Sequence, residues 1–208
     1  DIHELAAGKL AALIDRSAAG DRLLLEAGDY PGVLRVDKSI ALIGAQDGQS
    51  RILGNEKDHV IHVSAENVEI AHLTLAGSGK KLKDMHSAVF LDQSAHHAHI
   101  HHNHLDNNLF GVYIWGPNAA LVEHNRIISS NTPRMANRGN GVSLWRSPGS
   151  IVRHNTISGG RDGIFTNVST NNLFQHNHFH DLRFAVHYMY TEDSEVSHNR
   201  AENVKSAY

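Results

Sequence analysis

The sequence has no cysteine, and among its 208 residues it has only four prolines, three methionines and two tryptophans. The absence of cysteine excludes disulfide bonds and metal sites built on thiolates. No apolar stretch is long enough to cross a membrane as a helix. The net charge is −3, so the composition gives no reason to expect nucleic acid as a partner. A soluble, turn-rich fold remains, which the 17 glycines and 20% charged residues also fit.

A short phrase of the form apolar, any residue, His, Asn, any residue, apolar returns along the chain. One copy reads Val122-Glu123-His124-Asn125-Arg126-Ile127. The asparagines of the five copies are 22, 30, 22 and 22 residues apart, and they are Asn103, Asn125, Asn155, Asn177 and Asn199. Self-similarity at a fixed period is the signature of a solenoid.

A second phrase in each repeat begins with a small residue, as in Gly111-Val112-Tyr113-Ile114. Both phrases alternate with period two, which is typical of short strands with one buried face. Two or three such strands with tight turns in about 22 residues predict one coil of a right-handed parallel β-helix, an all-β fold. We expect the asparagine column to point inward at a turn, where its amides hydrogen-bond along the stack.

The repeat continues without a linker, so we expect residues 1–208 to form a single β-helix domain. Within 1–20 we predict a helix that caps the open end, with one apolar stripe formed by Ile2, Leu5, Ala6, Leu10, Leu13 and Ile14. Residues 21–208 form the coils, with early strands at 22–26, 33–36 and 39–43. Tyr208 ends a coil that has no cap, so we expect the chain to be the N-terminal part of a longer protein.

Histidine is the compositional outlier, with 18 copies. Six histidines share one register of the repeat and should form a column at a turn: His72, His102, His124, His154, His176 and His198. Such a column could bind copper, zinc or nickel through imidazole, or it could consist of partly exposed turn residues without a ligand. A denser cluster spans 96–104, but strand alternation should send its histidines to different faces.

Two loops between the phrases are longer than the six residues found in other coils. They take 13 residues from Leu75 to Ala88 and 14 from Ile127 to Gly141, and both should leave the same corner. Thioether and imidazole together suit Cu(I), although filling gaps in a core is the alternative role of any one methionine. From these loops and the strand just past the corner we predict a metal site made of Met85, His86, Met135, His187 and Met189.

The strand that begins with the second phrase should expose aromatic side chains. If Val89 and its equivalents face inward, the alternate positions face outward and include both tryptophans. An exposed aromatic patch usually marks an interaction surface. We therefore predict a partner-binding face formed by Phe90, Tyr113, Trp115, Trp145 and Phe165.

The sequence resembles the NosD family. The resemblance rests on Asp181-Leu182-Arg183-Phe184-Ala185-Val186-His187-Tyr188-Met189-Tyr190-Thr191 and on Gly160-Arg161-Asp162-Gly163-Ile164-Phe165, with support from 109–113 and 138–142. It implies a periplasmic β-helix protein, not an enzyme, that works with the membrane and ATPase subunits of an ABC-type complex. That complex takes part in assembling the copper–sulfur cluster of nitrous oxide reductase, with a lipoprotein chaperone supplying copper.

By position, the resemblance carries over to His187, Met189, Met135 and Met85. The histidine column departs from it, because the family more often has Gly, Asp or another polar residue before the Asn. The resemblance implies transient binding and transfer of Cu(I), or docking of the partners that carry it out.

The alternative is a β-helix that binds or degrades polysaccharide. Stacking tryptophans could bind sugar rings, and hydrolysis by paired carboxylates needs two acids within about 5–10 Å. Only Asp84 and Asp92 come near that requirement, and Asp84 lies in a loop. A purely structural module, with ligand binding elsewhere in a longer protein, is also open.

Overall fold

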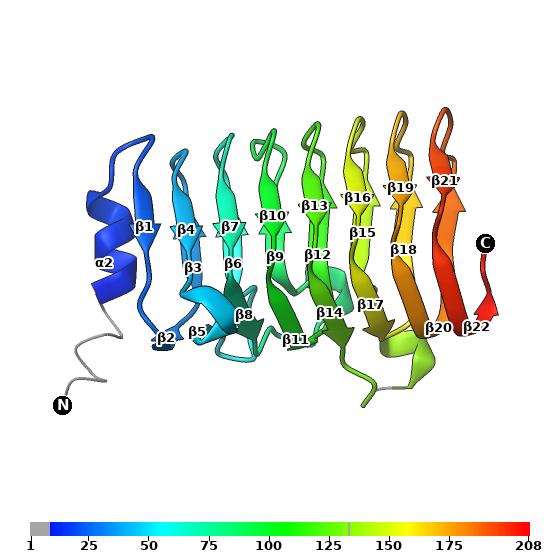
Figure 1. Cartoon of the computed structure of the whole chain (residues 1–208), viewed down its shortest axis with the longest axis horizontal. Helices are drawn as coiled ribbons and strands as arrows, with labels where there is room; N and C mark the ends of the chain where they lie inside the picture. Colours follow the sequence, from blue (N-terminus) through cyan, green and yellow to red (C-terminus); the bar gives the residue numbers. More distant parts are fainter. Residues whose placement is uncertain (1–8, 133) are drawn as a thin grey trace.

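Successive turns of the chain stack side by side along one long axis, and each turn contributes short parallel strands to the same sheets (Figure 1). The computed structural model describes residues 9–132 and 134–208. The chain is all-β and forms the parallel β-helix that the repeat predicts. In the described part of the chain, no helix is long and apolar enough to cross a membrane.

The first sheet contains eight strands of three residues each. In spatial order they are β1 (Arg22–Leu24), β4 (Ala41–Ile43), β7 (Glu69–Ala71), β10 (His99–His101), β13 (Leu121–Glu123), β16 (Ile151–Arg153), β19 (Leu173–Gln175) and β21 (Glu195–Ser197). Equivalent positions of the His–Asn phrase lie in register across it, as in Ile100 opposite Val122.

The second sheet has two arms that meet in one long strand, β20. The first arm is β2 (Gly28–Pro31), β5 (Ser50–Leu53), β8 (Leu73–Ala76), β11 (His104–Asn108), β14 (Arg126–Ser129) and β17 (Thr156–Gly159). After β20 (His178–Met189), the second arm is β18 (Asp162–Asn167), β15 (Val142–Trp145), β12 (Phe110–Trp115), β9 (Ser87–Leu91), β6 (Ile61–Val63) and β3 (Leu34–Val36), and β22 (Arg200–Ser206) pairs with β20.

Helix α2 (Lys9–Arg16) lies against the end of the solenoid that begins with β1 (Figure 1). Leu10 and Ile14 are buried against the core, and Lys38 Nζ donates to the carbonyl oxygen of Ile14, 3.1 Å away. Leu13 differs from the predicted stripe, because it remains 40% exposed. The face of α2 that contacts the solenoid is narrower than the predicted apolar stripe, because it buries only side chains about one helical turn apart. Ile2, Leu5 and Ala6 of that prediction lie outside the described residues.

The core is a column of aliphatic side chains inside the coils. The predicted inward positions of the second arm have no exposed surface, and they are Val89, Val112, Val142, Ile164 and Val186. The early strands begin or end within two residues of the predicted limits, while β2 was not predicted. Its segment contains Pro31 and Gly28, which are unfavourable in strand interiors.

The asparagine column confirms its predicted structural role. Asn125 Oδ1 accepts hydrogen bonds from the backbone N–H and side-chain amide of Asn103, at 3.0 and 3.1 Å. Its own amide donates to the carbonyl of Ile100 and to Asn155 Oδ1. The pattern continues through Asn177 to Asn199. Each buried amide therefore satisfies backbone groups that the turn would otherwise leave unpaired.

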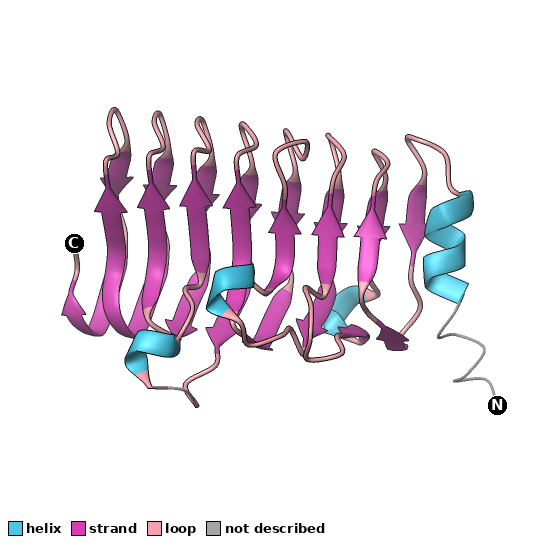
Figure 2. Cartoon of the chain, turned by 180° about the vertical axis from the view of Figure 1, so that it is seen from behind, coloured by secondary structure: helices cyan, strands magenta, loops and turns pink. Residues whose placement is uncertain are grey.

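Two longer loops leave the same edge of the solenoid, since each connects a strand of the first arm to one of the second (Figure 2). Residues 77–86 contain the short helix η2 (Leu82–Asp84), and residues 130–141 contain η3 (Met135–Asn137). A third short helix, η1 (Gln46–Gly48), connects β4 to β5. The common corner predicted for the two methionine-bearing loops is confirmed.

Candidate functional site

The outward face of the second arm carries an aromatic stack. Trp115 and Trp145 lie opposite each other on β12 and β15, with ring centroids 5.5 Å apart and planes 11° from parallel. The guanidinium carbon of Arg146 lies 4.7 Å from the centroid of Trp145 on this stack. Both indole rings are partly exposed. The two tryptophans therefore form a rigid, partly exposed aromatic surface, a type of surface that is common at protein interfaces.

His187 lies farther along this face and is held by a buried ion pair. Arg183 Nε and Nη2 donate to the two oxygens of Asp162, at 2.9 and 2.7 Å, and the side chain of Asp162 has no exposed surface. His187 Nδ1 lies 3.1 Å from Asp162 Oδ2. The hydrogen bonds to Asp162 raise the pKa of the Arg183 guanidinium. Arg183 Nη2 lies 3.4 Å from the same Nδ1, farther than Asp162 Oδ2. If Nδ1–H donates to the carboxylate, Nε2 carries the free lone pair of the ring, the arrangement that orients metal-binding histidines.

Met189 is the exposed sulfur neighbour of His187. It lies two residues farther along β20 on the same outward face, opposite Asn167 of β18, and is 40% exposed. Residues i and i+2 of a strand are about 7 Å apart, a gap that a methionine side chain can close toward an imidazole. Tyr188 and Tyr190 beside it are also exposed. The end of β20 thus presents one imidazole and one thioether to solvent.

The other predicted sulfur ligands lie elsewhere on the same flank. Met85 follows η2 and precedes β9, and Met135 begins η3 and precedes β15. The strand order places one intervening strand between β9 and β15, and one between β15 and β20. Met135 lines a cavity of about 480 Å³ with Asp181, Leu182, Asn203 and others near the start of β20. Met189 stands at the opposite end of that strand, so the methionines do not form one preformed cage.

His86 and Phe90 are less accessible than the sequence predicts. His86 is buried, and the backbone N–H of Lys81 donates to its Nδ1 at 3.4 Å. Phe90 points away from the core, as predicted, but is only 5% exposed because His59 stacks on it at 4.3 Å. The cause is the segment between β5 and β6, which folds over this end of the second arm. The exposed part of the predicted face is therefore Tyr113, Trp115, Trp145 and Phe165, each of which is partly exposed.

Burial also sets the ionisation of His59. Desolvation lowers the pKa of His59 to about 4, with the nearby Asp58 opposing this shift and His62 and His86 adding to it. The backbone N–H of Ser87 donates to His59 Nδ1 at 3.2 Å, which requires a neutral acceptor nitrogen. His59 is thus a neutral packing residue at neutral pH.

The histidine column forms a regular ladder. Neighbouring rings from His102 to His198 stack with centroids 4.9–5.0 Å apart, and His72 continues the stack at 5.1 Å. Every member has a positive φ of 52–57°. Histidine, asparagine and aspartate are the residues that tolerate this left-handed conformation best after glycine. The left-handed turn therefore explains why histidine recurs at this position, and this agrees with the alternative in which the column binds no ligand.

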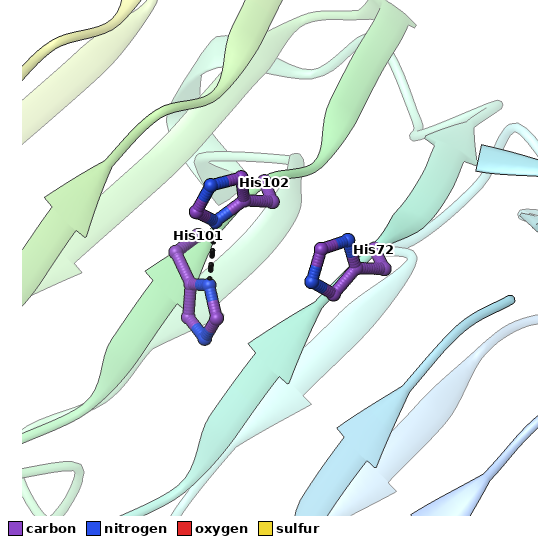
Figure 3. A group of neighbouring side chains, drawn as sticks. All are labelled: His72, His101 and His102. Atoms are coloured by element: carbon purple, nitrogen blue, oxygen red, sulfur yellow. Dashed lines mark hydrogen bonds between the residues drawn. The ribbon is translucent and has the colours of Figure 1, made fainter. Parts of the chain in front are cut away.

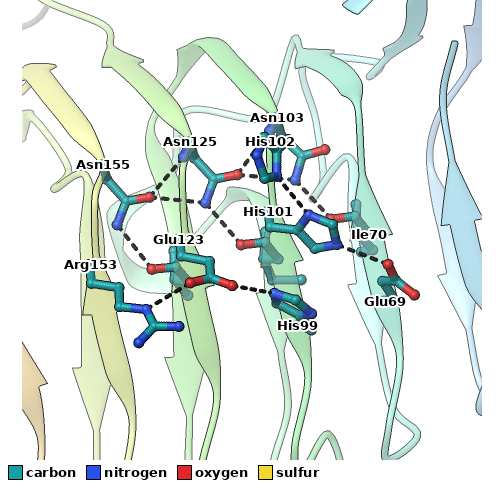
Figure 4. A network of polar contacts seen from close by, with 12 residues as sticks. Glu69, Ile70, His99, His101, His102, Asn103, Glu123, Asn125, Arg153 and Asn155 are labelled. Carbon is teal, nitrogen blue, oxygen red and sulfur yellow. Dashed lines mark hydrogen bonds and ion pairs between the residues drawn. The ribbon is translucent and has the colours of Figure 1, made fainter. Parts of the chain in front are cut away.

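One end of the ladder differs from the rest, because additional side chains converge there (Figure 3). His101 Nδ1 lies 2.8 Å from His102 Nδ1, and its ring is nearly perpendicular to those of His102 and His72. His101 Nε2 lies 2.9 Å from Glu69 Oε1 (Figure 4). The cluster of 96–104 is divided among different faces, as alternation predicts. His99 and His101, two residues apart, share one face of β10 and stack at 4.0 Å.

Sequence reasoning missed Glu69, although a signal was present. The register pairs Glu69 directly with His99, so alignment of the repeats would have placed the carboxylate beside the histidine cluster. Burial raises the pKa of the Glu69 carboxyl, but the hydrogen bonds from His101 and Arg22 outweigh this effect and leave it below its ordinary value. Glu123 similarly accepts from His99 and Arg153.

Comparison with known proteins identifies the family. A family model described as "Periplasmic copper-binding protein (NosD)" matches residues 122–208. A "Probable ABC transporter binding protein NosD" of Stutzerimonas stutzeri is 31% identical over 150 residues, which cover 69% of this chain and 32% of that protein. The chain belongs to the NosD family. A Pseudomonas aeruginosa NosD protein with the same description is 30% identical over 147 residues, covering 70% of this chain and 34% of that protein.

This NosD chain spans about a third of the length of these curated relatives. Solved structures support the fold alone, since their sequence identities are low. The Dettilon tailspike protein aligns with a TM-score of 0.61 at 14% identity, covering 87% of this chain and 42% of that one. An alginate lyase from Paenibacillus sp. gives 0.58 at 13% identity and covers 95% and 94% of the two chains. The pectin methylesterase of Erwinia chrysanthemi gives 0.52 at 8% identity and covers 94% and 88%.

Proposed function

We propose that this protein is a periplasmic copper-handling accessory protein of an ABC-type complex that helps assemble the copper–sulfur cluster of nitrous oxide reductase. The family description supports the copper and the periplasm, and the names of the relatives support the ABC transporter. The observation that carries the proposal is the end of β20, where His187 is oriented by Asp162 and stands beside the exposed Met189.

Cu(I) is the cargo in this proposal, and His187 and Met189 are its ligands. Imidazole nitrogen and thioether sulfur form a soft donor set suited to Cu(I). Asp162 and Arg183 fix the His187 ring before copper arrives, so less ordering is needed when the ion binds. Met189 keeps its mobility because it is exposed. Two accessible ligands leave room for a partner's ligands to take the ion by exchange.

Met85 and Met135 remain part of the proposed route as secondary sulfur donors. Their loops lie two coils apart, about 10 Å along the solenoid axis, and Met189 stands at the opposite end of β20 from the cavity that Met135 lines. Their side chains are partly exposed. Cu(I) bound by the sulfur of Met85 or Met135 alone would be held weakly. Weak binding at these positions fits transfer of the ion rather than its storage. His86 contributes by packing the Met85 loop rather than as a ligand.

The stack of Trp115 and Trp145 is the proposed docking surface for the partners. These are the membrane and ATPase subunits, the lipoprotein copper chaperone and nitrous oxide reductase. The stack lies in the same outward column of β12, β15, β18 and β20 that ends at Met189. A partner seated on the tryptophans would thus reach the copper ligands about two strand spacings away.

The alternative, carbohydrate binding or degradation, has less support. The indole faces that a sugar ring would need are turned toward each other and toward Arg146. Asp92 is paired with His62 at 3.0 Å, and Asp84 lies 4.0 Å from His86, so each acid already has a basic partner. Neither acid is presented as one of a free catalytic pair.

The test is the copper–sulfur cluster content of nitrous oxide reductase purified from cells that carry full-length variants of this protein. His187→Asn with Met189→Leu should lower the cluster content severalfold, because both ligands are removed. Tyr190→Phe, at an exposed neighbouring position, is the matched control and should leave it unchanged. Normal cluster content in the double variant would refute the proposed route.

A further inference from the structure

We propose that His72, His101 and His102 form a second metal site, specific for a divalent cation of borderline softness such as Zn²⁺ or Cu²⁺. This site is independent of the proposed Cu(I) ligands. His72 and His102 lie at the turns that follow β7 and β10, and His101 is the last residue of β10 (Figure 3). His187 and Met189 stand near the end of β20, on the other sheet.

The first argument is the number of donors that converge. One ligand atom from each of the three histidines lies within 4.8 Å of the other two. In a tetrahedral zinc site, nitrogens bound at about 2.0–2.1 Å are about 3.3 Å apart. The separation of 2.8 Å between the Nδ1 atoms of His101 and His102 is already close to that value. The His72 nitrogen, within 4.8 Å of the other two, would move toward them when a cation binds.

The second argument is the contrast with the rest of the ladder. From His124 to His176 the rings are within 3° of parallel, and the ring of His198 is tilted by 21° from that of His176. At the other end, His101 comes from the strand rather than the turn, and its ring stands 86° from that of His102. The perpendicular ring of His101 thus brings its Nδ1 next to the stacked rings of His72 and His102 as a third possible ligand atom. In the described part of the chain, groupings of three potential donors of this type occur only around His101.

The third argument is the hydrogen-bond network around His101 (Figure 4). Arg22 donates to Oε2 of Glu69 at 2.9 Å. Because an ionised carboxylate can only accept, the other oxygen, Oε1, accepts from His101 Nε2–H. The proton on Nε2 leaves His101 Nδ1 as an acceptor for His102 Nδ1–H. When a cation binds, the exposed His102 moves its proton to Nε2 by exchange with water. Both Nδ1 lone pairs then face the metal, with no net proton released.

Glu69 acts in this site as a positioning residue. A carboxylate that accepts from the far nitrogen of a metal-bound histidine fixes the tautomer and makes the ligand more basic. Glu69, His99 and His101 also form a three-donor group, but it shares His101 with the first. The ion pair with Arg22 occupies Glu69, which favours the all-histidine set. Imidazole ligands with a carboxylate behind them suit Zn²⁺ and Cu²⁺.

The site is open to solvent on one side. His72 and His102, but not His101, line a cavity of about 290 Å³ beside the site. His102 is exposed, and His72 and His101 are partly exposed. A cation can therefore reach these three side chains from solvent, and water can supply the remaining ligand.

The test is a titration of the full-length protein with Zn²⁺ against a chromophoric chelator, after removal of bound metal. We expect one Zn²⁺ site whose affinity falls at least 100-fold in His101→Gln and about 10- to 100-fold in Glu69→Gln, because Glu69 acts through His101. His176→Asn is the matched control, since it alters the ladder in the same turn conformation and should change nothing. Met189→Leu should also leave Zn²⁺ binding unchanged.

A second variant guards against a folding defect. His72→Asn keeps a residue that tolerates positive φ, and it should weaken Zn²⁺ binding while the unfolding midpoint without metal stays near that of the wild type. With Cu²⁺, the spectrum of the wild type should show coupling to more ring nitrogens than that of His101→Gln. Zn²⁺ affinity that is equal in the wild type, His101→Gln and His72→Asn would overturn the proposal. So would the absence of any Zn²⁺ site in the wild type.

Discussion

Nδ1 of His187 lies 3.1 Å from Oδ2 of Asp162, a carboxylate with no exposed side-chain surface. Arg183 binds the same carboxylate through two nitrogens. The His187 ring is thus held by a buried carboxylate, while its side chain is 29% exposed. In the proposed copper site, this contact would fix the orientation of the His187 ring before the ion binds.

We expect Asp162→Asn to weaken Cu(I) binding about 10- to 100-fold, because the amide does not replace the charge that orients His187. It should also lower the free energy of unfolding by about 3 kcal/mol, since Arg183 loses its buried partner. Chelator competition and urea unfolding measure the two effects. Asp181→Asn is the matched control, because Asp181 also pairs with a histidine of β20, His180 at 2.8 Å, but is exposed. Equal effects of the two substitutions would contradict this role.

The asparagine ladder should dominate the stability of the coils. Asn155→Leu removes the acceptor for the backbone N–H and side-chain amide of Asn125 and the donor to the Val122 carbonyl. We expect a loss of about 3 kcal/mol in the free energy of unfolding, because these groups stay buried without partners. Asn199→Leu is the control at the less buried end of the ladder, where water can replace lost bonds, and should cost less. The urea midpoints distinguish them, and a larger loss for Asn199→Leu would contradict the argument.

Stability should fall in mild acid because of His59. Its pKa is about 4 in the folded protein and about 6.5 in the unfolded chain. Between these two pH values, His59 is protonated in the unfolded chain but neutral in the folded protein. The contribution of neutral His59 to the free energy of unfolding is therefore fully present above pH 6.5, and it is lost as the pH falls toward 4. Allowing for partial solvent screening, we expect a loss on the order of 2 kcal/mol between pH 7 and pH 4.

Urea unfolding at several pH values measures this loss, with His59→Gln as the comparison. The variant lacks the titrating group, so its stability should depend less on pH over the same range. The pKa values of His101, His102 and His154 are also lowered, first by desolvation, so some dependence in the same direction should remain. An unchanged pH dependence in His59→Gln would contradict the assignment to His59.

The tryptophan stack should contribute to partner binding. We expect Trp145→Ala in the full-length protein to weaken binding to the purified membrane and ATPase subunits at least 10-fold, because central aromatic side chains dominate interfaces. The loss of the stack with Trp115 should cost only about 1 kcal/mol of stability. Leu24→Ala on β1 removes an exposed apolar side chain far from this face and is the control. If both variants bind the subunits equally well, the stack is not a docking surface.

The sequence predicts most of the fold because each coil repeats the same local rules. The period, the alternation and the His–Asn phrase predict the strands, the turns and the inward asparagines. The positive φ of the histidines was not predicted, although it explains why a residue such as His124 precedes each asparagine.

The candidate site was predicted less completely, because its decisive contacts join residues 21 to 32 positions apart. The burial of Phe90 depends on His59, in a segment that does not follow the repeat. The contact of Glu69 with His101 runs diagonally between two coils, so strand alternation alone does not reveal it. The Asp162–Arg183 pair is likewise diagonal, because the register of β18 and β20 sets Asp162 opposite Phe184.

The most direct test of the proposed copper route is an anaerobic titration of the full-length protein with Cu(I) against a chromophoric chelator. We predict one tight Cu(I) site in the wild type, lost in His187→Asn with Met189→Leu and retained, with slower transfer to the chelator, in Met85→Leu with Met135→Leu. Unchanged Cu(I) affinity in the His187 and Met189 double variant would contradict the account, because no tight ligand would then lie at the end of β20.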